Sequence, residues 1–394
     1  MTFRIAPFIS VALLVLIGIW GWFLSLETGG RALAFSLLAG AAFGIVLQRG
    51  RFCFLCNFRD LVEKREAGGV IAILLALAAG TVFYQIVMAS WAPVPQPGRL
   101  PPGAHIGPVG WVLALAATVF GLGTALSGSC LSAHFYRLGE GAFGSLVALS
   151  GAAIGFLIGF ASWNSLYTVA VYDDPPLWLP HSLGYTGALI FSLTLLAGLT
   201  IASLWWSNGR LHPSERVRQS PSSVTAIFQP IFKDRWPPVV TGILIAAISA
   251  FAYFRVAPLG VTQELGSLVR TGGFSLGLVP ETLAGLDTAR GCISAIKTTL
   301  LSPNGLFVSG LILASFACAL IAGQFKPTWP NGRGLTLRFI GGLLMGWGGT
   351  TALGCTVGVL LSGIHAGAVS GWVFLLFCAL GTLAGLRLVR AITR

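Results

Sequence analysis

The chain has 394 residues, of which 55% are hydrophobic and only 9% are charged. Because soluble domains have about 25% charged residues, this composition excludes an ordinary soluble protein and indicates a polytopic membrane protein. The net charge is +12. The basic residues are dispersed along the loops rather than gathered on one soluble domain, which argues against a nucleic-acid partner and suits cytoplasmic loops or a path that attracts anions.

Residues 1–206 are predicted to form a first transmembrane half. Between its second and third apolar stretches, Gln48–Glu66 mixes basic residues, aromatics and two cysteines, and we expect a short interfacial or re-entrant helix there. Ser132–Gly141 is predicted to be a polar turn. The predicted spans of this half are Phe8–Leu26, Ala32–Leu47, Gly69–Ala89, Gly110–Leu126, Ala142–Trp163 and Gly184–Trp206.

Residues 207–238 form the longest polar stretch and are predicted to be a basic cytoplasmic linker. Residues 239–394 are then a second transmembrane half. Gly272–Leu286 is a doubtful span because it contains a proline and a glutamate, and counting it would place the basic C-terminal tail outside, against the positive-inside trend. The other predicted spans of this half are Val239–Phe254, Gly305–Ala322, Leu335–Leu353 and Ala366–Leu386.

Two glycine-rich segments resemble each other. FGLGTALSGSC ends at Cys130 and MGWGGTTALGC ends at Cys355, and in each the cysteine follows the second glycine of a Gly-x-Gly by seven positions. An earlier cysteine also recurs in each half, after an arginine two residues before it. These earlier pairs are Arg51 with Cys53 and Arg290 with Cys292. The repeated order predicts two pseudo-symmetric halves, because duplicated halves with interrupted helices are typical of transporters.

The repeated motifs predict a path for a small anion through the membrane. Glycines allow a helix to break, and the exposed N–H groups at a helix start bind anions. Arginines lower the barrier to entry, and neutral buried thiols make shallow sites that suit transit, especially for a sulfur-bearing substrate. The predicted substrate-binding residues are Cys53, Cys130, Cys292, Cys355, Arg51, Arg290, Gly128 and Gly354.

Two other classes of function remain open from the residues alone. Cys53-x-x-Cys56 is compatible with a membrane thiol-disulfide oxidoreductase. Cys130 and His134 have a spacing that places both on one helical face, as in a soft-metal pair. No catalytic constellation stands out, and the remaining acid of interest is Asp287, whose spacing from Arg290 suggests an ion pair with a role in proton coupling.

Several motifs resemble the YeeE/YedE family of membrane proteins. These are RGRFCF and NFRD (Arg49–Phe54 and Asn57–Asp60), GSCLSAHFYRLGEG, and LGCTVGVLLSGIHAGAVSG. The resemblance implies an all-α hourglass in which short half-helices meet in mid-membrane. It also implies passage of substrate along Cys53, Cys130 and Cys355, whereas Cys292 rests on the internal repeat.

From this resemblance we expect import of a small sulfur-containing oxyanion, most simply thiosulfate, across the bacterial inner membrane. Transport of selenium or other sulfur compounds is the alternative within the family. We expect no enzymatic activity, no cofactor and no bound metal. The expected partners are the small anion, the lipid bilayer and a cytoplasmic sulfur-carrier protein.

Overall fold

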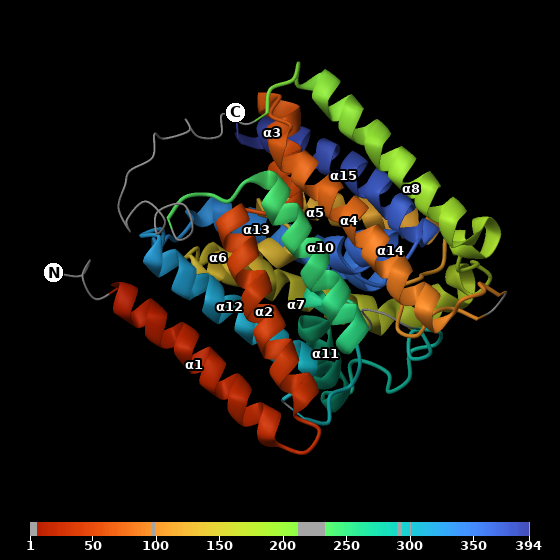
Figure 1. Ribbon diagram of the computed structural model, residues 1–394, viewed down its shortest axis with the longest axis horizontal. Helices are drawn as coiled ribbons and strands as arrows, with labels where there is room; N and C mark the ends of the chain where they lie inside the picture. The colour runs from red at the N-terminus through yellow and green to blue at the C-terminus, as the bar shows by residue number, and fades with distance from the viewer. Residues whose placement is uncertain (1–5, 97–98, 212–232, 290–293, 300, 394) are drawn as a thin grey trace.

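The computed structural model describes residues 6–96, 99–211, 233–289, 294–299 and 301–393. Within these ranges the secondary structure is helical, with no named strand, which confirms the all-α prediction (Figure 1). The α-helices are α1 (Ala6–Leu26), α2 (Arg31–Gly50), α3 (Phe54–Lys64), α4 (Gly68–Trp91), α5 (Trp111–Ser127), α6 (Leu131–Gly139), α7 (Gly144–Leu166), α8 (Leu179–Trp206), α10 (Pro238–Arg255), α11 (Val261–Ser275), α12 (Pro303–Ile321), α13 (Gly332–Thr351), α14 (Gly363–His365) and α15 (Val369–Thr393). Two π-helices, η1 (Tyr167–Val171) and η2 (Thr356–Ser362), continue α7 and follow α13.

The described part of the chain forms a polytopic membrane protein. Nine helices, some joined to a short neighbour, are long and apolar enough to cross a membrane, and α13 with η2 and α14 forms a tenth candidate bent by 45°. The doubtful segment Gly272–Leu286 is not a span, because α11 ends at Ser275 and irregular backbone follows. Ten crossings place the start of α1 and the end of α15 on the same side, as the positive-inside trend requires.

The connections gather on two faces of the helix bundle. On the first, Arg390 near the end of α15 forms an ion pair with Glu63 of α3, at 2.8 Å. Lys326 N–H donates to Glu140 O on the same face. We call this the basic face and expect it to be cytoplasmic. On the opposite face, Val109 N–H donates to the carbonyl oxygen of Pro175. This bond links the loop before α5 to the loop before α8.

Helices from before and after residues 207–238 pack directly against each other. The pairs α2 with α12, α7 with α13 and α5 with α15 share the core. At Gly40 of α2 an added Cβ would overlap the carbonyl of Phe307 in α12, and at Gly342 of α13 it would overlap the carbonyl of Ala148 in α7. Small residues at these crossings let the backbones approach closely, as in other membrane bundles.

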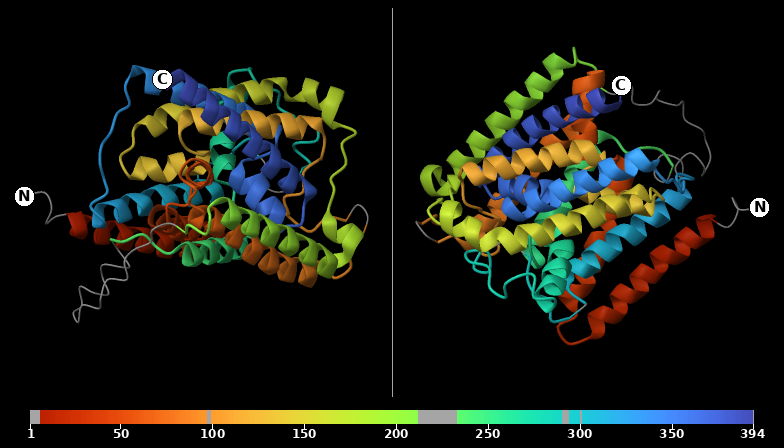
Figure 2. Two further views of the ribbon diagram at one scale, coloured as in Figure 1. Left: turned by 90° about the horizontal axis from the view of Figure 1, so that it is seen from above. Right: turned by 180° about the vertical axis from the view of Figure 1, so that it is seen from behind.

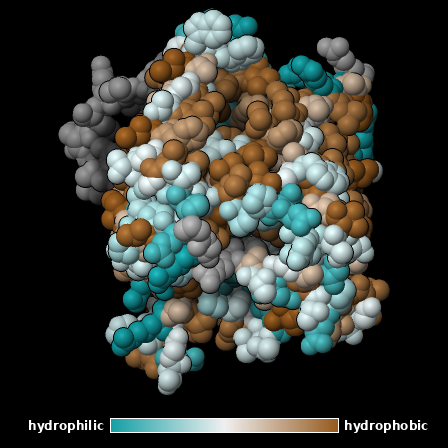
Figure 3. All heavy atoms as spheres, turned by 90° about the vertical axis from the view of Figure 1, so that its right-hand side faces the viewer, coloured by the Kyte–Doolittle hydropathy of each residue, from teal (hydrophilic) through white to brown (hydrophobic). Residues whose placement is uncertain are grey.

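Helices α1 and α8 lie at opposite edges of the bundle (Figures 1 and 2). Both expose large apolar side chains, including Phe8 and Trp22 of α1 and Ile201 and Trp205 of α8. Figure 3, which faces the right-hand side of Figure 1, shows apolar side chains gathered over the upper part of that side, with polar ones more frequent below. Exposed apolar helices of this length match a lipid environment.

The prediction of a polar turn over Ser132–Gly141 is wrong, because this stretch is largely the short helix α6. Ser132 and His134 are buried, and His134 forms hydrogen bonds with Ser127 and Ser145, each at 3.2 Å. Polar residues can be buried in a helix when other side chains satisfy their hydrogen bonds. The polarity of the stretch therefore marks an internal site rather than a surface turn.

Candidate functional site

The first cysteine of the predicted path lies where one helix ends and another begins. Arg51 ends α2 in a left-handed conformation, with φ 47° and ψ 43°, and its N–H donates to Leu47 O. Cys53 follows in an extended conformation as the residue that precedes α3, and its side chain is fully buried. The thiol is thus held at the N-terminal end of a helix, where the helix dipole favours negative charge.

Cys130 occupies an equivalent local position at the next break. Gly128 ends α5 with φ 83° and ψ 7°, a left-handed conformation that glycine adopts without strain. Cys130 then directly precedes α6 and is also buried. The Cys53 and Cys130 sulfur atoms lie 3.8 Å apart, at sulfur hydrogen-bond distance. The fold thus brings together two predicted site residues that are far apart in the sequence.

Cys355 lies at a third break of the same kind. Leu353 has a positive φ of 63° and Gly354 a φ of 154°, and Cys355 then precedes η2 in an extended conformation. The Cys355 sulfur accepts a hydrogen bond from Val357 N–H at 3.3 Å. A backbone N–H aimed at this position illustrates how the helix start can serve an anion or a sulfur atom.

A cavity of about 90 Å³ lies beside Cys130. Its wall is apolar over most of its area and includes Thr356, the residue after Cys355, and Cys378 of α15. The neighbours of Cys378 along the chain are apolar or small, as around an ordinary core cysteine. The structure places it on the wall that Cys130 also lines.

Arg137 of α6 connects the cysteine region to the basic face. Its guanidinium donates to Cys56 Sγ at 3.3 Å and to Gly128 O at 3.4 Å. Arg137 was not among the predicted site residues, although it lies two turns after Cys130. Arg51, by contrast, is exposed and follows α2 at the basic face. It therefore lies near the cysteine region, but on the side expected to be cytoplasmic.

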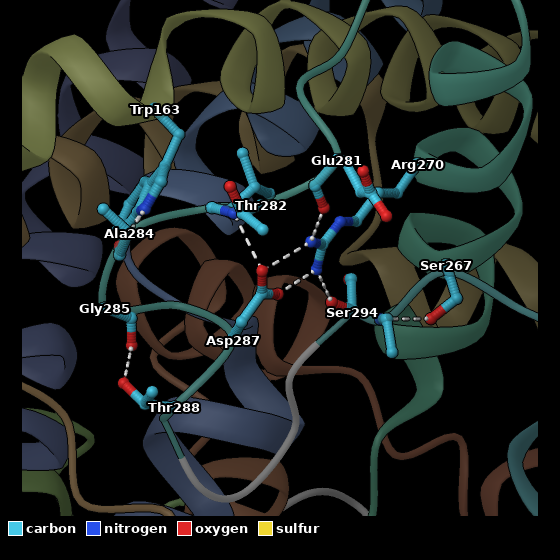
Figure 4. Close-up of polar contacts among 12 residues, drawn as sticks. Trp163, Ser267, Arg270, Glu281, Thr282, Ala284, Gly285, Asp287, Thr288 and Ser294 are labelled. Atoms are coloured by element: carbon cyan, nitrogen blue, oxygen red, sulfur yellow. Dashed lines mark hydrogen bonds and ion pairs between the residues drawn. The ribbon is translucent and has the colours of Figure 1, made fainter.

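A second polar cluster organises the opposite face (Figure 4). Arg270 of α11 is buried, and its guanidinium donates to Ser294 O at 2.8 Å and to Glu281 O at 3.0 Å. It also forms an ion pair with Asp287 at 2.6 Å. The observed partner of Asp287 is thus Arg270, a pairing that spacing along one helix does not predict because the two residues are 17 positions apart. Arg290 lies outside the described residues, as does Cys292.

Asp287 is held in its ionised form by this cluster. Partial burial acts to raise the pKa of its carboxyl group, but the hydrogen bonds from Arg270 and from Leu283 N–H outweigh burial and lower the pKa below its ordinary value. A carboxylate that stays ionised and bridges a loop to a buried arginine has a structural role. Gly354, the residue before Cys355, lines a small cavity of about 20 Å³ together with Leu286 and Ser294.

The family model for sulphur transport matches residues 49–384, which include all three cysteine-bearing breaks. The chain belongs to this family. It is similar to the thiosulfate transporter TsuA of Escherichia coli K12, with 27% identity over 88% of this chain and 91% of that protein. It is 28% identical to TsuA of Spirochaeta thermophila, over 88% of this chain and 95% of the relative. The probable transporter YedE of Escherichia coli K12 is 25% identical over half of this chain.

Membership of this family confirms the resemblance that the cysteine motifs indicated. The family match begins at Arg49 and so covers the break that carries Cys53 as well as the breaks at Cys130 and Cys355. The roles of Cys53, Cys130 and Cys355 in substrate passage stay predictions, as does the pseudo-symmetry of the two halves.

Proposed function

We propose that this protein imports thiosulfate across the bacterial inner membrane, along a path that passes Cys53, Cys130 and Cys355. The observation that carries the proposal is the approach of the Cys53 and Cys130 sulfur atoms to 3.8 Å, where two helix breaks meet in the core of a sulphur-transport protein. The two relatives named TsuA, which align over most of the chain, support thiosulfate as the substrate.

The geometry at the breaks supports a sequence of weak contacts rather than one strong site. Each cysteine precedes a helix, so the thiol and the first backbone N–H groups of that helix face the same region. A thiol is a weak donor and its sulfur a weak, polarisable acceptor. Such contacts offset part of the lost hydration of a divalent anion without trapping it.

The remaining elements of the proposal follow from the same residues. Arg51 lies at the inner mouth, while Arg290 and Cys292 are proposed outer counterparts on the basis of the internal repeat. Residues 1–206 and 239–394 are proposed as the two related halves and residues 207–238 as their basic cytoplasmic linker. We propose a transporter without enzymatic activity, and a cytoplasmic sulfur-carrier protein as the acceptor of the imported sulfur.

The test is uptake of radiolabelled thiosulfate into proteoliposomes that contain the purified protein. We expect uptake that excess unlabelled thiosulfate suppresses and that sulfate, sulfite and selenite suppress less. Cys130→Ala should abolish it. The lost packing at this buried position should cost about 1–3 kcal/mol, so the variant should still fold. Cys130→Ser should lose nearly as much uptake, because a buried serine hydroxyl donates its hydrogen bond to a backbone carbonyl and not to the substrate.

Cys318→Ala is the matched control, because Cys318 is also a buried thiol, on α12. It should retain uptake. Full activity of Cys130→Ser would show that any small polar group suffices, and equal losses in Cys130→Ala and Cys318→Ala would show that packing, not the thiol path, is what the variants disturb.

A further inference from the structure

A second cavity, of about 140 Å³, opens on the basic face below the Cys130 break. Arg137 of α6 and Arg338 of α13 both line it, together with His134 and Ser145. Its rim includes Thr328, which is exposed, whereas His134 and Ser145 are buried. The cavity therefore leads from the surface to polar side chains inside the protein. None of the motifs in the sequence predicted it.

The two arginines in this cavity lack an acidic partner. Among the described residues no carboxylate forms an ion pair with Arg137 or Arg338. Glu140, the acid that follows α6, is close enough to Arg137 to attract it, but its carboxylate accepts a hydrogen bond from Gln48 at 3.3 Å and forms no ion pair with Arg137. Arg137 donates to Gly128 O and Cys56 Sγ, and it also interacts with the hydroxyl group of Tyr136. Two guanidinium groups that line one cavity without a directly paired carboxylate repel each other, and an anion between them would relieve that repulsion.

Other features of the cavity also favour an anion. It contains Gly144 and Ser145, the first residues of the long helix α7, whose N-terminal end carries partial positive charge. An added Cβ at Gly144 would lie 2.6 Å from a guanidinium nitrogen of Arg338, so the arginine lies directly against this helix start. One water molecule requires roughly 10–15 Å³ of such a cavity. The cavity volume of about 140 Å³ is much larger and can therefore admit a small tetrahedral ion.

The cavity is joined to the cysteine region by direct bonds. His134 Nε2 contacts Ser127 Oγ at 3.2 Å, and Ser127 in turn donates to Ser129 O, the carbonyl next to Cys130. Arg137 donates to Gly128 O on the same loop. An anion leaving the Cys130 region toward the basic face would meet these groups next.

We propose that this cavity is a binding site for a small divalent oxyanion, thiosulfate in particular, on the cytoplasmic side of the cysteine path, with Arg137 and Arg338 supplying its charge. The identity of the ligand rests on the proposed function. The cavity is then the last binding site before release into the cytoplasm. An anion that has passed the cysteines binds there in contact with water, and the water restores the hydration of the anion.

The test is calorimetric titration of the detergent-solubilised, full-length protein with thiosulfate and, separately, with sulfate. Arg338→Gln should weaken binding at least tenfold. Arg333→Gln is its matched control, because Arg333 is exposed on the same helix, outside the cavity, and its loss changes the net charge equally. This control should bind like the wild type, and so should Cys318→Ala, since Cys318 lies on α12 and does not line this cavity.

A second variant guards against misfolding of Arg338→Gln. Thr328→Asp places a negative charge at the exposed rim and should also weaken binding, whereas Thr336→Asp, at an exposed position of α13 outside the cavity, should not. Unchanged affinity in both Arg338→Gln and Thr328→Asp would overturn the proposal. Equal losses of affinity in the variants and in their controls would also overturn it. The same holds if phosphatidylglycerol, titrated in place of thiosulfate, is the one ligand whose binding depends on Arg338, because the cavity would then be a site for lipid headgroups.

Uptake measured in parallel separates this proposal from the proposed function. If the wild type binds thiosulfate through Arg338 but proteoliposomes import none, the anion site stands and thiosulfate import is wrong. If import is normal and dependent on Cys130 while titration finds no Arg338-dependent binding, the transporter stands and the cytoplasmic anion site is wrong.

Discussion

Replacing Gly128 with alanine should impair uptake by straining the loop that carries Cys130. Gly128 has φ 83° and ψ 7°, and an added Cβ would meet no atom within 4 Å. The cost is therefore backbone strain alone, about 1–2 kcal/mol for an L-residue in the left-handed region. If the loop relaxes to remove this strain, Cys130 leaves its position beside Cys53, and 1–2 kcal/mol corresponds to a factor of roughly 5–30 in population.

The measurement is the initial rate of thiosulfate uptake. Thermal unfolding of the same samples is monitored by size-exclusion chromatography after heating. Gly29→Ala is the matched control: Gly29 has φ 79°, an added Cβ there also meets no atom within 4 Å, and it lies in the connection between α1 and α2. We expect similar losses of stability in both variants and a loss of uptake in Gly128→Ala alone. Normal uptake in a destabilised Gly128→Ala protein would refute the coupling between this backbone conformation and the path.

Three further predictions concern packing, charge and pH. Gly40→Ala should strongly reduce the yield of folded protein, because its Cβ would overlap Phe307 O, whereas Gly18→Ala, with no atom within 4 Å, should not; equal yields would contradict the close packing of α2 and α12. Arg51→Gln should raise the apparent KM for thiosulfate and weaken the ionic-strength dependence of uptake, and unchanged kinetics would make Arg51 only a topological signal. Asp287→Asn should lower the unfolding temperature at pH 7, because the lowered pKa of Asp287 contributes stability that is fully present above its unfolded value of about 4 and is lost as the pH falls through the lower pKa of the folded state; a difference from wild type that does not shrink below about pH 4 would show another cause.

Composition and local pattern were sufficient to predict the class of fold and the positions at which helices are interrupted beside the cysteines. An apolar stretch long enough to cross the membrane must form a helix, because lipid offers no other partner for its backbone groups. A glycine or proline beside a polar residue then marks where such a helix is interrupted. For this reason the breaks at Cys53, Cys130 and Cys355, and the non-spanning nature of Gly272–Leu286, could be predicted from the sequence.

Contacts between residues distant in the chain could not be predicted in the same way, because hydropathy and spacing describe only neighbours along one helix. Nothing local to Cys53 indicates that its sulfur lies 3.8 Å from that of Cys130, which is 77 positions away. Asp287 pairs with Arg270 from another element, and Arg338 reaches the cavity beside Arg137 only because α13 packs against α7. The sequence by itself determined a helical membrane protein with cysteine-bearing breaks, whereas the close packing of helices at their glycines decided which thiols and which charges meet.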